Sequence, residues 1–190
     1  AGAAYQGMFK NPLVSPDILG AAAGSGFGAS LALLFGFSMG LVQACSFAGG
    51  IAAVFIAVSI NRRVFYDPLL GLVLGGMMVS TVFQSGISLI KFLADADDLL
   101  PSITFWLMGS FSSITKYDIR ILAPLVLVGC VIIMMMGRRL NVMSFGEEEA
   151  KTMGVDPRIT RIVVISAATV ITAASVSVCG LIGWIGLVVP

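Results

Sequence analysis

The chain has 190 residues, of which 58% are hydrophobic and 11% charged, whereas about a quarter of the residues in a water-soluble domain are charged. The formal net charge of +1 gives no electrostatic case for nucleic-acid binding, and the mean hydropathy of +1.03 indicates an integral membrane protein. Histidine, the commonest general base and a frequent metal ligand, is absent, so we expect no catalytic site and no metal site. The cysteines lie far apart in apolar runs without C-x-x-C spacing, as expected of small buried hydrophobes: Cys45, Cys130 and Cys179.

Charge-free runs predict the membrane spans in chain order. The run over residues 18–61 is too long for one span and predicts two helices joined by a tight turn near residues 35–40. No alternating strand pattern appears, and backbone within lipid must satisfy its own hydrogen bonds, so the fold class is all-α, a polytopic transmembrane helical bundle. We expect a single transmembrane domain over 1–190, with spans at 18–35, 40–60, 68–90, 117–137 and 158–178, and a further helix after a break at 179–186.

Lysine and arginine are distributed unequally between the two sides of such a bundle. If the spans alternate, eight of these residues fall on one side and three on the other, so the positive-inside rule makes the first side cytoplasmic. The three outer ones are Lys91, Lys116 and Arg120. The eight inner ones are Lys10, Arg62, Arg63, Arg138, Arg139, Lys151, Arg158 and Arg161.

On the outer side, the segment after the third predicted span is too short to cross a membrane and is interrupted by Pro101 and Gly109. We expect a short interfacial helix at 101–109, with Trp106 near the lipid headgroups. The aspartates that follow the third predicted span fit solvated loop charges: Asp95, Asp97 and Asp98.

The longest polar stretch occupies residues 143–156 and carries helix-capping signals. Ser144 and Glu147 have the spacing of a capping box, and Gly154 suits the position that follows a helix. Asp156 and Pro157 then suit the N-cap and first residue of the next span, so we expect a short helix joined to that span by a turn of about two residues. The capping pattern alone fits a surface loop and a docking element for a cytoplasmic partner equally well. The apolar residues of this stretch are Phe145, Ala150, Met153 and Val155.

The third predicted span carries polar side chains along one face. Ser80, Gln84 and Ser88 follow one another at four-residue intervals, and Thr81 and Ser85 widen the strip. Such residues form hydrogen bonds between helices, worth about 0.6 kcal/mol each, or line a water-filled pathway. Both interpretations stay open. The opposite face is apolar: Leu72, Val79, Phe83 and Ile90.

Glycine also recurs at helical intervals. Gly20, Gly24 and Gly28 continue through Ala32 to Gly36, which gives one helix a smooth face for close packing. The stretch at residues 24–28 has glycine spacing similar to a nucleotide-binding fingerprint, but it follows no strand and lies in an apolar run. No phosphate-binding G-x-x-x-x-G-K-[ST] loop occurs in the sequence, so this chain is not itself an ATPase.

Four segments, taken in order, resemble the signatures of one family. They read NPLVSPDILG at 11–20, FWLMGSF at 105–111, GEEEAKTMGV at 146–155 and GLIGWIGLVVP at 180–190. Together they are similar to the permease subunits of bacterial and archaeal ATP-binding-cassette (ABC) importers for iron–siderophores, haem and cobalamin, and the likeness covers the whole chain. The resemblance implies part of a type II ABC importer permease fold. Members of that family have more spans per subunit, so the chain is expected to be an internal fragment.

The resemblance also implies roles for particular segments. Residues 143–156 would dock on an ATPase subunit, the third span would border the translocation pathway, and 101–109 would line its outer mouth beneath a binding protein. The implied ATPase-coupling residues are Ser144, Gly146, Glu147, Glu148, Glu149, Ala150, Met153, Gly154 and Val155. The implied pathway-lining residues are Ser80, Thr81, Gln84, Ser85 and Ser88. The implied inner gate is Val64, Phe65, Tyr66, Asp67 and Pro68.

What the resemblance implies overall is a transport subunit and not an enzyme. It would import a metal chelate across the inner membrane of a bacterium or archaeon, as a homodimer, with ATPase subunits that bind ATP and magnesium and with an extracytoplasmic substrate-binding protein. Ferric siderophore is the expected cargo because it is the commonest substrate class in the family, with haem and cobalamin still open. The alternatives are an ion-coupled secondary transporter and an intramembrane protease, and both need ionisable or catalytic residues at membrane depth that the predicted spans lack.

Overall fold

The computed structural model describes residues 1–190 except 65–67, 113, 184 and 190. The described residues form helices and no strands, which confirms the all-α prediction. In chain order the elements are α1 (Gly2–Phe9), the 3-10 turn η1 (Pro16–Leu19), α2 (Ala21–Leu34), α3 (Met39–Val64), α4 (Pro68–Leu93), α5 (Leu99–Met108), α6 (Lys116–Met143), α7 (Glu147–Thr152), α8 (Pro157–Cys179) and α9 (Ile185–Val188).

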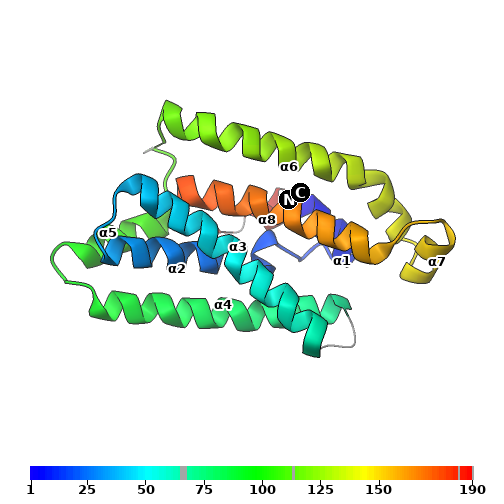
Figure 1. Ribbon diagram of the computed structural model, residues 1–190, viewed down its shortest axis with the longest axis horizontal. Helices are drawn as coiled ribbons and strands as arrows, with labels where there is room; N and C mark the ends of the chain where they lie inside the picture. The colour runs from blue at the N-terminus through cyan, green and yellow to red at the C-terminus, as the bar shows by residue number, and fades with distance from the viewer. Residues whose placement is uncertain (65–67, 113, 184, 190) are drawn as a thin grey trace.

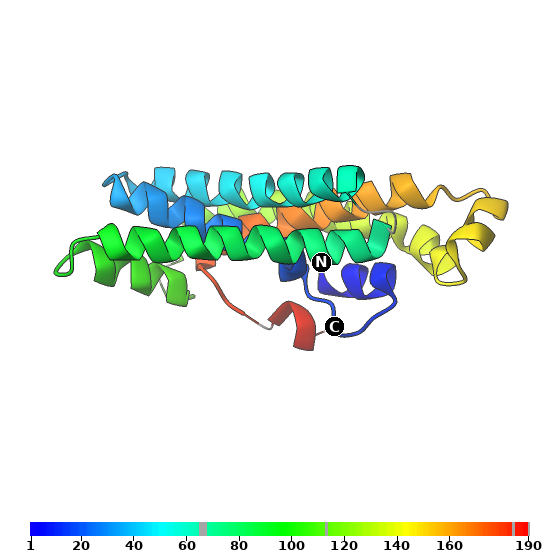
Figure 2. The same ribbon diagram turned by 90° about the horizontal axis from the view of Figure 1, so that it is seen from below.

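Four of these helices, α3, α4, α6 and α8, are long and apolar enough to cross a membrane. They run side by side along the long axis of the molecule (Figures 1 and 2). The end of α3, the start of α4 and the whole of α7 lie at one end of this bundle, and α5 and the start of α6 lie at the other (Figure 1). Most of the basic residues assigned to the cytoplasmic side therefore gather at the α7 end.

The expected span at 18–35 differs in the structure. Ser15 accepts a hydrogen bond from the Asp17 N–H and opens η1, and Gly20, with a φ of 84°, closes it. The helix that follows, α2, has 14 residues, fewer than the roughly 20 needed to cross a bilayer. The absence of charge made this segment resemble a full span, but the turn at Gly20 shortens its helix.

Small residues allow α2 to lie directly against α3. A Cβ atom at Gly24 would overlap the carbonyl oxygen of Gly49, and one at Gly28 would overlap that of Cys45. Gly76 on α4 approaches the carbonyl oxygen of Ile18 in the same way. The close packing predicted from the glycine spacing is confirmed at Gly24 and Gly28, where a side chain would push the two backbones apart, but not at Gly36, where a Cβ atom would meet nothing within 4 Å.

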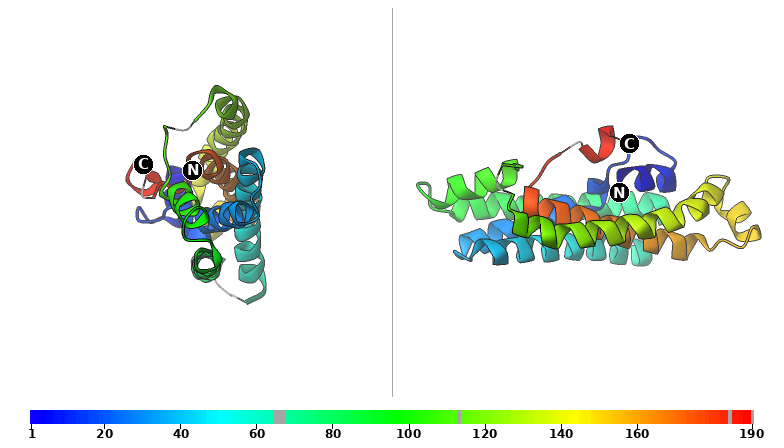
Figure 3. Two further views of the ribbon diagram at one scale, coloured as in Figure 1. Left: turned by 90° about the vertical axis from the view of Figure 1, so that its left-hand side faces the viewer. Right: turned by 90° about the horizontal axis from the view of Figure 1, so that it is seen from above.

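The interior of the bundle forms around α8. Seen end on, α8 lies inside the bundle and α6 lies at its edge (Figure 3). Val164, Ile165 and Ala168 of α8 pack with Tyr5 and Leu72 in the largest cluster of buried apolar side chains. The chain then leaves α8 at Gly180, whose φ is 73°, and returns toward α1, where the Gln6 side-chain amide donates to the Leu187 carbonyl at 3.2 Å. The further helix expected after the break is α9.

At the opposite end from α7, the short outer helix occupies Leu99–Met108, close to the expected 101–109. Ile103 is fully buried, and Trp106 packs against a small cluster of Ala29, Ala32 and Val42. Trp106 is therefore half-buried against α2 and α3. Helix α5 thus closes over the outer ends of these two helices.

Candidate functional site

Helix α7 lies at one end of the bundle, between the peripheral span α6 and the central span α8 (Figure 1). The predicted capping box of Ser144 and Glu147 is wrong. Helix α6 continues to Met143, so Ser144 completes its last turn and donates its hydroxyl hydrogen to the Asn141 carbonyl at 2.6 Å. The N-cap of α7 is Gly146, whose φ of 139° is one that a side chain would strain.

The other end of α7 has the geometry that the sequence predicted. Gly154 has a φ of 78°, and its N–H donates to the Lys151 carbonyl at 3.0 Å. The Val155 N–H donates to the Ala150 carbonyl at 2.9 Å, and together these bonds form a Schellman motif. Gly154 thus lets the chain reverse direction within one short turn.

The start of α8 is also as predicted. The Asp156 carboxylate accepts hydrogen bonds from the N–H groups of Arg158, at 2.8 Å, and Ile159, at 3.3 Å, and Pro157 occupies the first position of the helix. The Thr160 hydroxyl donates to the Asp156 carbonyl at 2.9 Å. These bonds fix the turn between α7 and α8 at its second end.

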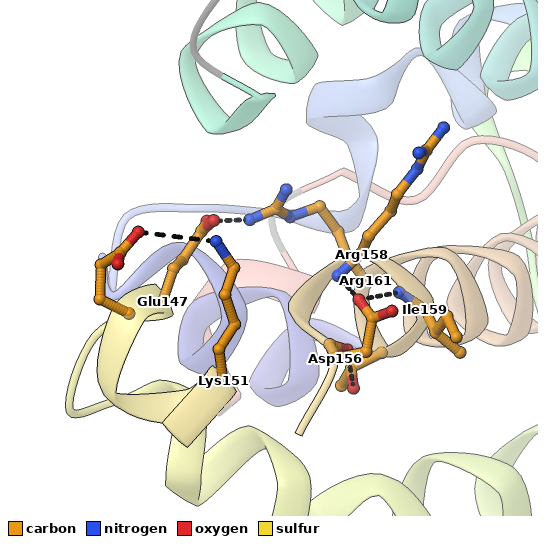
Figure 4. A network of polar contacts seen from close by, with 8 residues as sticks. Glu147, Lys151, Asp156, Arg158, Ile159 and Arg161 are labelled. Carbon is orange, nitrogen blue, oxygen red and sulfur yellow. Dashed lines mark hydrogen bonds and ion pairs between the residues drawn. The ribbon is translucent and has the colours of Figure 1, made fainter. Parts of the chain in front are cut away.

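An ion pair joins the two helices directly. The Arg161 guanidinium donates to the Glu147 carboxylate (Figure 4), and the Arg161 side chain is 9% exposed. Removal of Glu147 would leave a buried guanidinium without its carboxylate, which is far more costly than the loss of a surface pair. The neighbouring pair of Lys151 and Glu148, at 3.5 Å, is exposed and contributes little. Arg161 was missed as a site residue because its partner lies on the far side of a chain reversal.

The outward surface of α7 combines acidic and large apolar side chains. Ala150 is fully buried beneath the helix, whereas Phe145 is 71% and Met153 is 60% exposed. Glu148 and Glu149 are exposed beside them, and Val155 is half-buried. Two large apolar side chains held at the tip of a rigid, charged projection fit a contact surface better than a solvated loop.

The polar strip of α4 points away from the interior of this chain. Thr81, Gln84, Ser85 and Ser88 are exposed and Ser80 is half-buried, whereas Leu72, Val79 and Ile90 on the opposite face are buried. The Thr81 and Ser85 hydroxyls donate to the carbonyls of Met77 and Thr81, each at 2.9 Å. The Ser88 hydroxyl likewise donates to the Gln84 carbonyl at 3.1 Å. These three hydroxyls thus bond to their own helix, and their outward surface is available to a partner or to water.

One cavity joins this strip to two of the signature segments. It has a volume of about 620 Å³ and lies between η1, α4 and the segment that returns from α8. Ser80 and Thr81 line it from α4, Ser15 and Asp17 from η1, and Leu187 from α9. Segments far apart in the sequence therefore meet beside the strip, and no local pattern in the chain indicated this convergence.

The expected inner gate lies mostly outside the described residues. This applies to Phe65, Tyr66 and Asp67, while Val64 ends α3 and Pro68 begins α4. Among the residues that the structure describes, no three cysteine or acidic side chains gather as metal ligands.

Comparison with known proteins gives one consistent result. The model of the FecCD transport family matches residues 1–190. The molybdate import permease MolB of Haemophilus influenzae is 39% identical, with all of this chain aligned to 56% of its length. The cobalamin import permease BtuC of Halobacterium salinarum is 34% identical over all of this chain and 51% of its own, and the hemin permease HmuU of Yersinia pestis is 29% identical over 58% of its length.

A solved structure of a metal-chelate-type ABC transporter in an inward-facing conformation superposes with a TM-score of 0.91 at 36% identity. The superposition covers all of this chain and 61% of that one. The chain spans little more than half the length of the curated relatives it matches. With a family model that matches its whole length, this chain belongs to the FecCD transport family.

Proposed function

We propose that this chain forms part of the permease of an ABC importer and that α7 is the element on which a cytoplasmic ATPase subunit docks. The observation that carries the proposal is the rigid joint between α7 and the central span α8. The Schellman turn at Gly154, the Asp156 cap and the ion pair between Glu147 and Arg161 all hold α7 to one membrane-length helix. A force applied to α7 is thereby transmitted into the bundle.

The exposed strip of α4 supports a pathway on the same proposal. Two copies of the permease, facing each other across this strip, would enclose a route lined by hydroxyl and amide groups without formal charge. The residues 64–68 would gate its inner end, and α5 would lie beneath an extracytoplasmic substrate-binding protein. The setting is the inner membrane of a bacterium or archaeon.

A metal chelate, and first a ferric siderophore, is the cargo we propose. An uncharged lining lets a large chelate pass without being held by an ion pair. The relatives support the broad class, because they are named for molybdate, cobalamin, hemin and iron-citrate import. An ion-coupled secondary transporter is not favoured, since the buried Arg161 lies at the α7 end of its span and is paired with Glu147.

The test requires the full-length permease with its ATPase and its binding protein in liposomes. Co-purification of the ATPase with the permease, and its loss when Phe145 and Met153 are both changed to Ser, would support docking at α7. ATP-dependent uptake of radiolabelled ferric siderophore is then compared with uptake of molybdate, cobalamin and haemin. Accumulation driven by an ion gradient without ATP would contradict the proposal, and uptake of another of these substrates would correct the cargo.

A further inference from the structure

A second feature at the α7 end is a pocket with basic walls. It has a volume of about 530 Å³ and lies where α3, α7 and α8 meet. Four basic side chains line it, and its two carboxylates are already engaged, Glu147 with Arg161 and Asp156 with the first N–H groups of α8. The basic residues are Arg62, Lys151, Arg158 and Arg161. The lining therefore has more basic than acidic side chains, although Lys151 also pairs with Glu148 outside the pocket.

Arg161 is the innermost of these basic groups. Its side chain is 9% exposed, and its Nε has no hydrogen-bond partner among the described residues. A buried charged donor without an acceptor is costly, so an anion in the adjoining pocket would stabilise the Arg161 guanidinium. Arg158 extends away from the ion pair (Figure 4), and both Arg158 and Arg62 are exposed. Because Asp156 already accepts from the first N–H groups of α8, an anion here would be held by guanidinium groups.

An apolar groove continues from this pocket along the membrane spans. It has a volume of about 340 Å³ and lies between α3 and α8. It shares Val58, Arg62, Ile162 and Ile165 with the basic pocket. Its further lining includes Phe55, which is 72% exposed, so the groove is open to its surroundings along the span. A charged cavity at the end of two spans thus leads into an apolar channel along them.

We propose that this composite site binds one anionic phospholipid, with the phosphate among Arg62, Arg158 and Arg161 and an acyl chain in the groove between α3 and α8. A free phosphate would use the basic pocket and leave the groove empty, whereas a lipid matches both parts. The α7 end is the side assigned to the cytoplasm, where anionic lipids attract basic residues next to the spans. This binding does not depend on which cargo the protein carries or on whether α7 docks an ATPase.

Native mass spectrometry of the purified full-length permease, titrated with dioleoylphosphatidylglycerol or dioleoylphosphatidylcholine, tests the proposal. The wild type should retain phosphatidylglycerol in preference to phosphatidylcholine. The double variant Arg62→Gln with Arg158→Gln should bind it roughly twenty-five-fold more weakly, since each basic residue near the membrane surface contributes about fivefold. The matched control is Arg138→Gln with Arg139→Gln, which removes the same charge from exposed positions of α6 at the same end and should change little. Equal losses in the two double variants would overturn the proposal in favour of general surface attraction.

A second arm distinguishes the lipid from a soluble anion. Ser59 lines the groove and not the basic pocket, so Ser59→Phe should fill the acyl site and weaken phosphatidylglycerol binding, while Ser59→Ala should not. Ser166→Phe makes the same test from α8 if Ser59→Phe unfolds, as judged by thermal melting. Glycerophosphoglycerol, the headgroup without acyl chains, should compete poorly. Strong competition by glycerophosphoglycerol, with no effect of either Phe variant, would show a site for a soluble anion. Equal binding of phosphatidylglycerol and phosphatidylcholine would show that protein covers the groove. Either result overturns the proposal.

Discussion

Helices α6 and α8 are both long and apolar enough to cross a membrane, yet they have opposite surroundings. In the most apolar stretch of α6, 6% of the residues are buried inside this chain, against 56% in α8. The buried face of α8 carries the small residues Ala167, Ala168 and Ala173 beside Val164 and Ile165, whereas the exposed positions in the middle of α6 are mostly Leu, Val, Ile and Met. Lipid is as apolar as leucine, so the hydrophobic effect does not draw helices together inside a membrane. Small side chains, which let helices approach closely, therefore mark the helix that packs against others.

The two ends of α7 are also attached to these helices in different ways. On the α8 side, α7 is attached by a Schellman turn, an N-cap and an ion pair to the helix at the centre of the bundle. On the α6 side it follows Gly146, which caps α7 without a side-chain bond, and α6 itself lies at the edge. If α7 has the role proposed above, its displacement is expected to move α8 first and α6 second.

The largest expected effect is on folding, from the central helix. Ala168 on α8 is fully buried in the main apolar cluster, so Ala168→Leu should lower the free energy of unfolding by about 3 kcal/mol through overpacking. Val131→Phe on α6, at a position 54% exposed, should change it by less than about 0.5 kcal/mol. Denaturant or thermal unfolding of the detergent-purified protein measures both. Equal destabilisation would mean that α6 is enclosed in the full protein.

The next largest effect is expected on transport, from substitutions in the joint between α7 and α8. Glu147→Lys places a second cation beside the buried Arg161, and Gly154→Val forces a β-branched residue to a φ of 78°, strain worth about 1–3 kcal/mol. We expect each to reduce uptake in liposomes more than tenfold (about 1.4 kcal/mol) while ATP hydrolysis continues and the spans stay folded.

Glu148→Lys is the control for that joint, because Glu148 is exposed and belongs to a surface pair. The exchange Glu147→Lys with Arg161→Glu restores an ion pair in reversed orientation and should recover part of the uptake. Unchanged uptake by both Glu147→Lys and Gly154→Val would refute the idea that the joint transmits movement.

Helix α4 shows both surroundings in one element, which allows a sharper test of exposure. A cysteine that replaces Gln84 or Ser88 on the polar strip should react quickly with a water-soluble thiol reagent. We expect its rate to be at least about fivefold higher than that of a cysteine that replaces a buried residue on the opposite face. The reason is that the thiolate is the reactive form, and a thiol ionises only where water reaches it. The buried positions for this comparison are Val79 and Ile90. The native Cys130 on α6 is an internal control: it is exposed in the chain but should react slowly if it faces lipid. The other two cysteines are replaced first, and labelling is repeated with ATP and the ATPase subunit.

The outcome separates two kinds of exposed surface. Fast reaction on the α4 strip with slow reaction at Cys130 would mean that α4 faces water and α6 faces lipid. Equal rates around α4, or no reaction on the strip in any state, would mean that the polar residues join helices and that the pathway lies elsewhere.

Local features were predictable from the sequence because their causes lie within a few residues. Gly154, Asp156 and Pro157 could be assigned because caps and turns use adjacent backbone groups. The capping box at Ser144 failed because nothing local showed that α6 extends to Met143. Three features depend on where distant segments lie, so the sequence alone could not predict them. They are the ion pair of Glu147 and Arg161, the cavity shared by η1, α4 and α9, and the different burial of α6 and α8.

The smallest expected effect tests whether the surface of α6 at Gly137 is free of neighbours in the full protein. A Cβ atom at Gly137 would meet nothing within 4 Å, so Gly137→Ala should raise the free energy of unfolding by about 0.5–1 kcal/mol, because alanine restricts the unfolded chain and favours helix. Gly129→Ala on the same helix is the matched control. Its Cβ atom would lie 2.6 Å from the Ile171 side chain of α8, and this overlap should cancel the gain in the free energy of unfolding. Thermal unfolding of the full-length protein measures both. Destabilisation by Gly137→Ala would show that another segment or a second copy lies against α6 at this position, and the contrast between α6 and α8 would then hold for this chain but not for its assembly.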